Sequence, residues 1–354
     1  MKIKTGLVGY GLGGRSFHAP FITALPDLYE LVYVVERRSN LSQEKYPWVK
    51  VARTFDELLA DDSIDLIVIT TPNETHFPFA KQSLEAGKHV VLDKPMTVSG
   101  NDALRLIELS HQTKKIFSVY QNRRYASDFL AIRKLLDKKL LGSVHEFEAQ
   151  YNRYRPEIRD SWKETTSGGS GILYDLGPHL IDQAFCLFGI PESITADIRR
   201  QRPGTQTDDY FDIRLDFGYT KAILKAGMLV REQGPRYMIH GTRGSFIKYG
   251  DDPQDVDLRA GKSPADPAWG KEPEEQYGLL HTEADGKVIK ERVPSEAGNF
   301  GIYYANLYET LVHRAALKEK PEHGYNVVRI IELALESSRR RCTLPCSNLL
   351  KVSY

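Results

Sequence analysis

The chain has 354 residues, of which 41% are hydrophobic and 27% charged, and its formal net charge is +1. This length suggests two domains, with enough apolar content for a core in each. The balance of charge argues against a surface dedicated to nucleic acid, and no apolar run is long enough to cross a membrane, so we expect small molecules as partners.

The beginning of the chain and its cysteines indicate the compartment. Met1–Lys4 leads straight into the first predicted strand without an apolar signal core, so we do not expect export. The three cysteines are few and odd in number, which suits the reducing cytoplasm. Cys342 and Cys346 lack the further Cys or nearby His that would complete a tetrahedral site, so we expect no metal.

The first predicted strand ends in a run of glycines. Gly9, Gly11 and Gly14 have the spacing G-x-G-x-x-G. In a dinucleotide-binding turn the first glycine permits the tight bend, the second admits the pyrophosphate and the third lets helix and strand pack closely. The N–H groups that open the following helix would face the anion. An ordinary strand-to-helix turn can have the same glycines, so the rest of the sequence must decide between it and a dinucleotide-binding turn.

Up to about Tyr120, short apolar runs alternate with helical segments. The runs are hydrophobic throughout, as strands are when both faces of a sheet are covered. Repeated strand–helix–strand units predict a parallel, right-handed, doubly wound sheet, which is an α/β fold. The glycine turn then follows the first strand, where a dinucleotide-binding fold needs it. The later strands of this sheet are predicted at residues 31–35, 66–69, 89–92 and 116–119.

Beyond a helix predicted at 128–139, apolar and polar residues alternate, which is typical of a sheet with one buried face. We predict domains at 1–120 and 121–354, the second an α+β domain with a large, mostly antiparallel, open-faced sheet. Residues 251–299 are predicted as a long surface excursion. Two C-terminal helices, free to pack back on the first domain, should follow. The strands of the second sheet are predicted at 147–151, 194–198, 211–217, 222–230, 237–240 and 245–249.

The end of the second predicted strand carries charges of both signs. An acidic residue here binds the ribose 2′-OH of NAD, whereas arginines accommodate the 2′-phosphate of NADP. Glu36 is followed by Arg37, Arg38 and Ser39, and two guanidiniums with a hydroxyl make a good phosphate clamp. We expect NADP(H), with NAD(H) as the alternative. A solvated charge cluster is the competing interpretation for any one of these residues.

Polar residues follow the next two strands. The predicted strand 66–69 runs into Thr71-Pro72-Asn73 and His76, and the predicted strand 89–92 runs into Lys94-Pro95. The carboxyl ends of such strands form the cofactor crevice, so these side chains are expected to reach ribose or nicotinamide. A plain turn with Asn73 as a helix N-cap explains part of the same pattern.

A second group of polar residues lies in the segment Gly168–Asp182. Pro178 suits the first turn of a helix, which would place His179 and Asp182 one turn apart, with Asp175 just before the helix. A carboxylate beside an imidazole fixes its tautomer and raises its basicity. Because two carboxylates flank the histidine, we prefer a catalytic role over a purely structural one.

These motifs together resemble the Gfo/Idh/MocA oxidoreductases, over essentially the whole chain. The resemblance rests on the glycine turn, on Thr71–Asn73, on Lys94-Pro95 and on Gly171–Asp182. It implies a Rossmann domain, an open-faced mixed-sheet domain and dehydrogenation of sugars or polyols. In that family a lysine, an aspartate and a histidine form the catalytic set.

Transferred by motif, the catalytic set becomes Lys94, Asp175 and His179. Asp93 stands where the family usually has Glu, which puts only the reach of that carboxylate in doubt. The stretches Phe17–Pro20, Gln121–Arg124, Tyr151–Pro156 and His240–Gly250 are similar to the branch that contains NADP-dependent scyllo-inositol dehydrogenases. The expected cofactor contacts are Gly9, Gly11, Leu12, Gly14, Arg37, Arg38, Ser39, Thr71, Pro72, Asn73, His76, Lys94 and Asn122. The expected substrate contacts are Lys94, Asn122, Tyr154, Arg155, Trp162, Asp175, His179 and Asp182.

The resemblance implies hydride transfer between nicotinamide and a secondary alcohol of a cyclic polyol. The substrate expected before all others is scyllo-inositol or its ketone. A pyranose sugar or keto-sugar is the alternative substrate, and an NADPH-sensing binding protein without catalysis is the alternative of another class. An open sheet leaves a broad wet face in a monomer, so we expect a homodimer or homotetramer through the C-terminal sheet.

Overall fold

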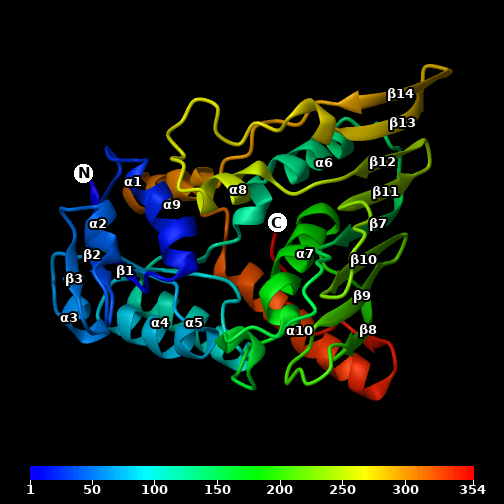
Figure 1. The fold of residues 1–354 in the computed structure, drawn as a ribbon. Coiled ribbons are helices and arrows are strands. Elements are labelled where there is room, and N and C mark those ends of the chain that lie inside the picture. Colours follow the sequence, from blue (N-terminus) through cyan, green and yellow to red (C-terminus); the bar gives the residue numbers. More distant parts are fainter. The chain divides into compact units, whose positions relative to one another are not determined.

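A computed structural model describes residues 1–354 and divides into two compact units (Figure 1). The first unit contains Met1–Asn122, Val256–Trp269 and Asn299–Tyr325. The second unit contains Arg123–Asp255, Gly270–Gly298 and Asn326–Tyr354. The chain therefore contributes three separate segments to each unit.

The first unit is built on a six-stranded parallel sheet with the order β3-β2-β1-β4-β5-β6. Its central strand β4 is buried at every residue, because helices cover both faces. This confirms the doubly wound parallel sheet predicted from the sequence. The strands are β1 (Ile3–Val8), β2 (Tyr29–Val35), β3 (Lys50–Ala52), β4 (Leu66–Ile69), β5 (His89–Leu92) and β6 (Phe117–Val119).

Local capping fixes where two of these helices begin. The hydroxyl of Thr54 accepts a hydrogen bond from Glu57 N at the start of α3, and that of Ser99 accepts one from Asp102 N at the start of α5. Tyr303 and Tyr304 of α9 bring the C-terminal part of the chain into the core of this unit. The helices are α1 (Ala19–Thr23), α2 (Leu41–Lys45), α3 (Phe55–Leu59), α4 (His76–Glu85), α5 (Gly100–Thr113) and α9 (Gly301–His313).

The second unit is built on a nine-stranded sheet with the order β14-β13-β12-β11-β7-β10-β9-β8-β15. Only β7 and β10 pair in parallel, so the predicted mostly antiparallel sheet is confirmed. The strands are β7 (Val144–Gln150), β8 (Ser193–Arg199), β9 (Tyr210–Phe217), β10 (Thr220–Gly227), β11 (Tyr237–Gly241), β12 (Gly244–Lys248), β13 (Gly278–Ala284), β14 (Lys287–Val293) and β15 (Leu344–Pro345).

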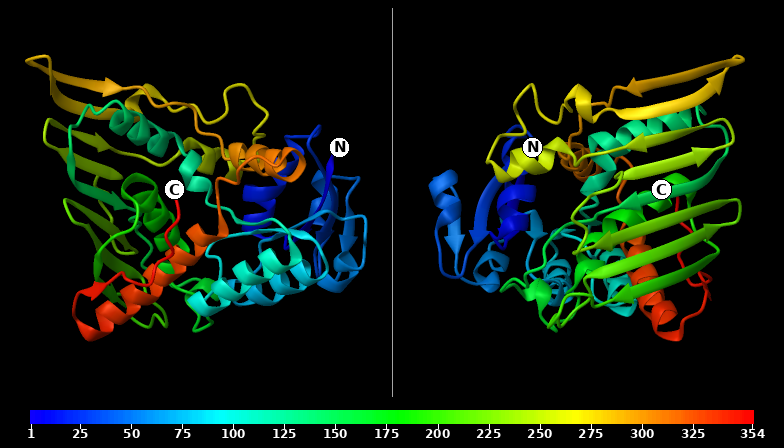
Figure 2. Two further views of the ribbon diagram at one scale, coloured as in Figure 1. Left: turned by 180° about the vertical axis from the view of Figure 1, so that it is seen from behind. Right: turned by 45° about the vertical axis from the view of Figure 1, so that its right-hand side comes forward.

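One face of this sheet is buried and the other is open. α7 packs on β9 and β10, and residues such as Phe147 and Leu224 alternate inward with no exposure. Figure 2 shows that no helix of the second unit lies over the other face. The remaining helices are α6 (Ser127–Asp137), α7 (Ile172–Phe188), α8 (Pro253–Arg259) and α10 (Pro321–Arg340).

The segment 251–299 is more ordered than its composition indicates. It contains α8 and the hairpin β13–β14, whose turn places Asp285 and Gly286 in the left-handed region. The prediction of a long surface excursion did not include this helix or this hairpin. The outer strand β14 has no fully buried residue, so its sequence lacks the apolar alternation that marks a strand, although Asp-Gly is a hairpin signal.

The start of α7 also differs from the prediction. The helix begins at Ile172, so Pro178 lies inside it and Asp175 belongs to its first turns. Proline at this position removes one N–H from the ladder, which usually marks the first turn instead. The real start is fixed by Asp208, a residue far along the chain, so no local pattern shows it.

Candidate active site

The glycine turn after β1 is shaped by close backbone approach. Gly9 has φ of +96°, and its carbonyl accepts a hydrogen bond from Thr70 Oγ1 at 2.9 Å. A Cβ on Gly14 would lie 2.1 Å from Gly9 O, so only glycine fits there. A Cβ on Gly11 would meet nothing within 4 Å. The turn is thus packed on its inner side and open over Gly11, which suits a pyrophosphate held by backbone N–H groups.

The acidic side chain at the end of β2 is turned into the protein. Glu36 is buried, and its carboxylate accepts hydrogen bonds from Ser39 Oγ at 2.6 Å, Leu41 N at 3.0 Å and Ser42 N at 2.8 Å. These bonds hold the pKa of Glu36 below its usual value although burial opposes them. The carboxylate caps α2 and has its hydrogen-bonding capacity largely occupied.

The arginines beside Glu36 remain available. Arg37 and Arg38 are exposed and make no hydrogen bond or ion pair within the chain. Arg53 braces their loop by donating to Glu36 O at 2.9 Å and to Ser39 O at 2.7 Å. Sequence reasoning missed Arg53, because nothing near it in the chain marks it as a partner of this loop.

His76 ties the ends of β4 and β5 together. The ring is 1% exposed, with Nδ1 2.8 Å from Pro95 O and Nε2 3.0 Å from Thr71 O. With both nitrogens facing backbone carbonyls, the ring is placed to brace the turn that carries Lys94. Thr71 also accepts a hydrogen bond from Thr75 Oγ1 at 2.6 Å, while Asn73 is buried. Direct cofactor contacts of these residues stay predictions, and for His76 a bracing role agrees better with its partners.

The carboxylate before Lys94 lies near a buried histidine that sequence reasoning did not include in the site. His18 is fully buried, its Nε2 lies 3.8 Å from Asp93 Oδ2, and its Nδ1 lies 2.7 Å from Tyr304 Oη. Asp93 Oδ1 accepts the N–H of Lys94 at 2.8 Å. Although burial opposes it, the nearby His18 and the charges of Lys94 and His76 lower the pKa of Asp93 to about 2. Asp93 therefore stays ionised next to the lysine.

In the second unit, α7 carries Asp175 and His179 four residues apart, on one face of the helix. His179 is 7% exposed and packs edge-on against Tyr151, with ring centroids 6.1 Å apart. Asp175 Oδ1 accepts a hydrogen bond from Lys163 Nζ at 2.7 Å. Lys163 belongs to the loop before α7, and only the fold brings it to Asp175.

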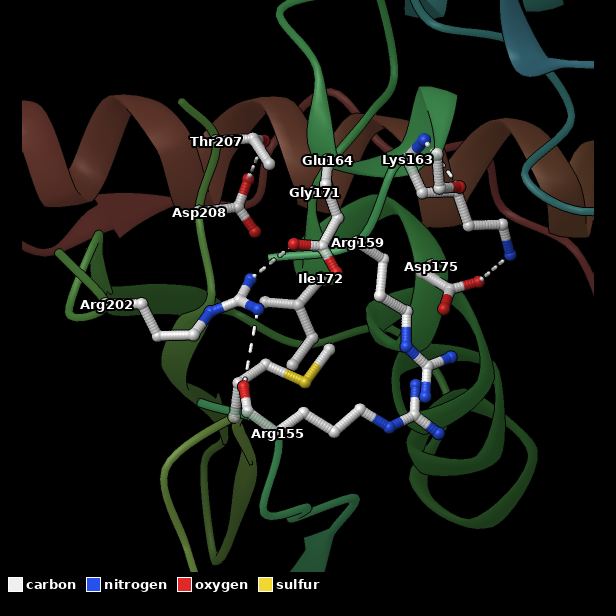
Figure 3. A pocket seen from close by; sticks show the side chains of 12 residues that line it. Arg155, Arg159, Lys163, Glu164, Gly171, Ile172, Asp175, Arg202, Thr207 and Asp208 are labelled. Carbon is white, nitrogen blue, oxygen red and sulfur yellow. Dashed lines mark hydrogen bonds and ion pairs between the residues drawn. The ribbon is translucent and has the colours of Figure 1, made fainter. Parts of the chain in front are cut away.

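Asp175 lines a pocket of about 90 Å³ in the second unit (Figure 3). Its wall is built around Arg202, which is 4% exposed and pairs with Glu164 at 2.9 Å and Asp209 at 3.0 Å. Arg202 also donates to the carbonyls of Arg155 and Glu157, and these bonds order the loop segment before Lys163. Of the predicted substrate contacts, Arg155 and Asp175 line this pocket.

The other predicted substrate contacts are distributed differently. Asp182 is 1% exposed, and Arg124 donates to both of its oxygens, at 2.8 and 2.6 Å. A substrate contact by Asp182 stays a prediction, and this buried pair counts against it. Tyr154 lies under the guanidinium of Arg231, 3.8 Å from the ring centroid. Trp162 is half-buried, next to Lys163.

Comparison with known proteins decides what these two units are. The description "Oxidoreductase family, NAD-binding Rossmann fold" matches residues 3–121, and "Oxidoreductase family, C-terminal alpha/beta domain" matches residues 133–345. The chain belongs to the Gfo/Idh/MocA family. It is therefore an NAD(P)-dependent oxidoreductase, a dehydrogenase acting on CH–OH groups, and the first unit contains its NAD-binding Rossmann fold.

Relatives cover nearly the whole chain. The NADP(+) scyllo-inositol 2-dehydrogenase IolW of Bacillus subtilis is 41% identical over 97% of this chain and 95% of its own. The uncharacterized oxidoreductase YdgJ of Escherichia coli is also 41% identical, over 97% and 98%. The structure of the putative oxidoreductase yvaA of Bacillus subtilis superimposes with a TM-score of 0.93 at 40% identity, covering 98% of each chain. No helix has both the length and the apolar character needed to span a membrane.

Proposed function

We propose that this Gfo/Idh/MocA enzyme interconverts a secondary alcohol and a ketone on a cyclic polyol, with scyllo-inositol and scyllo-inosose as the first pair to test. The observation that carries the reaction type is the face of α7, where Asp175 and His179 stand one turn apart. The name of the relative at 41% identity supports the substrate. A pyranose sugar is the alternative within the same reaction.

In the proposed mechanism His179 takes the hydroxyl proton of the alcohol. Asp175 orients the imidazole and favours its protonated form, and Lys163 holds Asp175 in turn. Lys94, anchored between Asp93 and the His76-braced turn, binds the same hydroxyl oxygen and stabilises the charge that develops on it. A bound nicotinamide supplies the hydride acceptor. The glycine turn would hold its pyrophosphate, and the ends of β4 and β5 would line the nicotinamide side.

NADP(H) is the proposed cofactor. Glu36 is occupied with capping α2, so the group that would select the 2′-OH of NAD is turned away. Arg37 and Arg38 stand exposed at the same strand end and can pair with a 2′-phosphate. The printed name of IolW, which specifies NADP(+), supports the same choice.

The test is a panel of inositol isomers and pyranose sugars, each assayed with NADP and with NAD. We expect the highest kcat/KM for scyllo-inositol with NADP. Oxidation of sugars in preference to all inositols would overturn the substrate, and a preference for NAD would overturn the cofactor. Tight NADPH binding without oxidation of any alcohol would contradict catalysis itself and favour an NADPH-sensing protein.

The open face of the second sheet is the proposed contact between subunits. Ile223, Met238, Ile247 and Leu279 stand in cross-strand register along β10, β11, β12 and β13, with Glu148 of β7 between the first two. These apolar side chains are half-buried on a face that no helix of the unit covers (Figure 2). A second copy would remove them from water, which favours a homodimer or homotetramer.

A further inference from the structure

The helix that carries Asp175 and His179 has no capping side chain of its own. Its N-cap residue is Gly171, with φ of +92°. The missing cap comes from Asp208, two residues before β9. The amide of Leu173 donates to Asp208 Oδ2 at 2.7 Å, and the amide of Ile172 donates to Asp208 O at 3.0 Å. Two of the N–H groups that open α7 are thus satisfied by one residue from elsewhere in the chain.

Gly171 makes room for this contact. A Cβ at Gly171 would lie 2.1 Å from Asp208 Oδ1 and 2.6 Å from Thr207 Oγ1. No other residue leaves space for the carboxylate, and the positive φ disfavours a side chain independently. Figure 3 shows Gly171, Ile172 and Asp208 around the same pocket as Asp175. The start of the helix and Asp175 of the candidate site therefore line the same pocket.

We propose that Asp208 is a positioning residue: it fixes the first turn of α7 from outside the helix and thereby sets where Asp175 and His179 stand. The inference rests on the proposed roles of those two residues. A carboxylate suits the site because it strengthens the bond to the Leu173 N–H and complements the positive end of the helix. A misplacement of about 1 Å at a reacting group can cost about 10²-fold in rate, so the cap matters for turnover.

The surroundings of Asp208 make its charge depend on pH. Burial, with a smaller contribution from the neighbouring Asp209, raises the pKa of Asp208 to about 6, against the bonds from Leu173 N and Thr207. Tyr174 faces it from α7. The charged groups in the same pocket are Arg155, Arg159, Lys163, Glu164, Asp175 and Arg202. Because Glu164 pairs with Arg202 and Asp175 with Lys163, these four largely neutralise one another.

Asp208→Asn tests the inference, because it keeps the size of the side chain and imitates the protonated form at every pH. We expect kcat at pH 8 to fall at least about tenfold while the KM for NADP stays the same. The ratio of wild-type to variant kcat should shrink as pH falls through 6, since the wild type then loses its charge too. Taking the ratio removes the titration of the catalytic imidazole, which both proteins share.

Stability provides the second readout. A carboxylate whose folded pKa is raised above the unfolded value of about 3.8 costs stability above pH 6. Asp208→Asn should therefore melt no lower than the wild type at pH 8, and its advantage should vanish near pH 4. A loss of activity with a parallel fall in Tm, or a kcat ratio independent of pH, would reduce Asp208 to a structural residue and overturn the proposal.

Two further variants complete the experiment. Gly171→Ala pushes a Cβ into the carboxylate and should lower kcat without changing the KM for NADP. Asp197→Asn, at a partly exposed position of β8, is the matched control and should change neither value. Hydrogen exchange of the Leu173 amide, expected to be faster in Asp208→Asn, needs no substrate. If the wild type oxidises no polyol, the proposed function fails, whereas unchanged exchange in Asp208→Asn defeats the cap alone.

Discussion

At the scale of single residues, Glu36 shows that an acidic side chain at the end of β2 does not by itself indicate NAD. An acid at the end of the second strand commonly marks NAD, yet here its oxygens are used by Ser39, Leu41 and Ser42. The order of residues could predict that both an acid and arginines stand at this strand end. It could not predict which of them turns inward, because that depends on the N–H groups of α2 and on the distant Arg53.

The two arginines give the first prediction. Each charge-assisted hydrogen bond to a phosphate contributes about 1.5–3 kcal/mol, so replacing both Arg37 and Arg38 by Gln should raise the KM for NADP by at least about tenfold. The KM for NAD should stay within about twofold of the wild type. Steady-state kinetics with both cofactors measure this, with the exposed Arg133→Gln as control. Equal losses with NAD and NADP would contradict a 2′-phosphate contact.

The catalytic assignment gives the second prediction. Positioned acid–base groups contribute about 10²–10⁴-fold, so Lys94→Met and His179→Ala should each reduce kcat by that order. NADPH binding, followed by its fluorescence, should change little because the glycine turn and Arg37–Arg38 are untouched. Near-normal turnover in both variants would remove Lys94 and His179 from the mechanism.

At the scale of elements, the glycine turn offers a matched pair of substitutions. Gly14→Ala forces a Cβ to within 2.1 Å of Gly9 O and should cost about 1–3 kcal/mol of stability. Gly11→Ala meets no protein atom within 4 Å, so its Tm should hold while its affinity for NADP falls. Calorimetry and cofactor titration separate the two effects. Normal NADP affinity in Gly11→Ala would show that the pyrophosphate does not pass over this glycine.

His89 of β5 provides the pH prediction. Its Nδ1 accepts the N–H of Ile116, and burial with the nearby Lys115 lowers the pKa of His89 to about 4. Since the unfolded histidine titrates near 6.5, the unfolded chain binds the proton first, and this contribution to stability is lost as pH falls from about 6.5 to 4. His89→Asn keeps a hydrogen-bond acceptor but does not titrate. Its Tm should therefore fall less than that of the wild type over this pH range. An identical pH dependence in both proteins would contradict it.

Elements with a strong internal pattern were the predictable ones. β4 and β5 were placed at their observed bounds because β4 is wholly apolar and β5 is apolar after His89. The hairpin β13–β14 was not predicted, since β14 lies at the sheet edge with its side chains in water. The start of α7 was not predicted, because its cap is a tertiary contact with Asp208. Of the candidate site, residue types next to strand ends could be predicted, whereas partners such as His18 and Lys163 required the fold.

At the scale of the whole molecule, the open sheet face predicts assembly. Replacing Met238 and Ile247 by Lys places two charges in the middle of the apolar row, where they would be buried by a partner. We expect the double variant to sediment as a smaller species than the wild type, with an unchanged far-UV spectrum. Tyr219→Lys, in the exposed turn between β9 and β10, is the control. An unchanged oligomer would exclude this face as the interface.

The division of each unit into three chain segments also constrains the order of folding. Tyr29 Oη donates to the carbonyl of Tyr304, and Tyr303 Oη donates to Ser118 Oγ, so residues of α9 complete the core around the first sheet. During synthesis those residues emerge only after most of the second unit has been made. The Rossmann fold, although its strands are encoded first, therefore cannot complete its core before α9 has been made, and a fragment cut at residue 122 would lack part of that core.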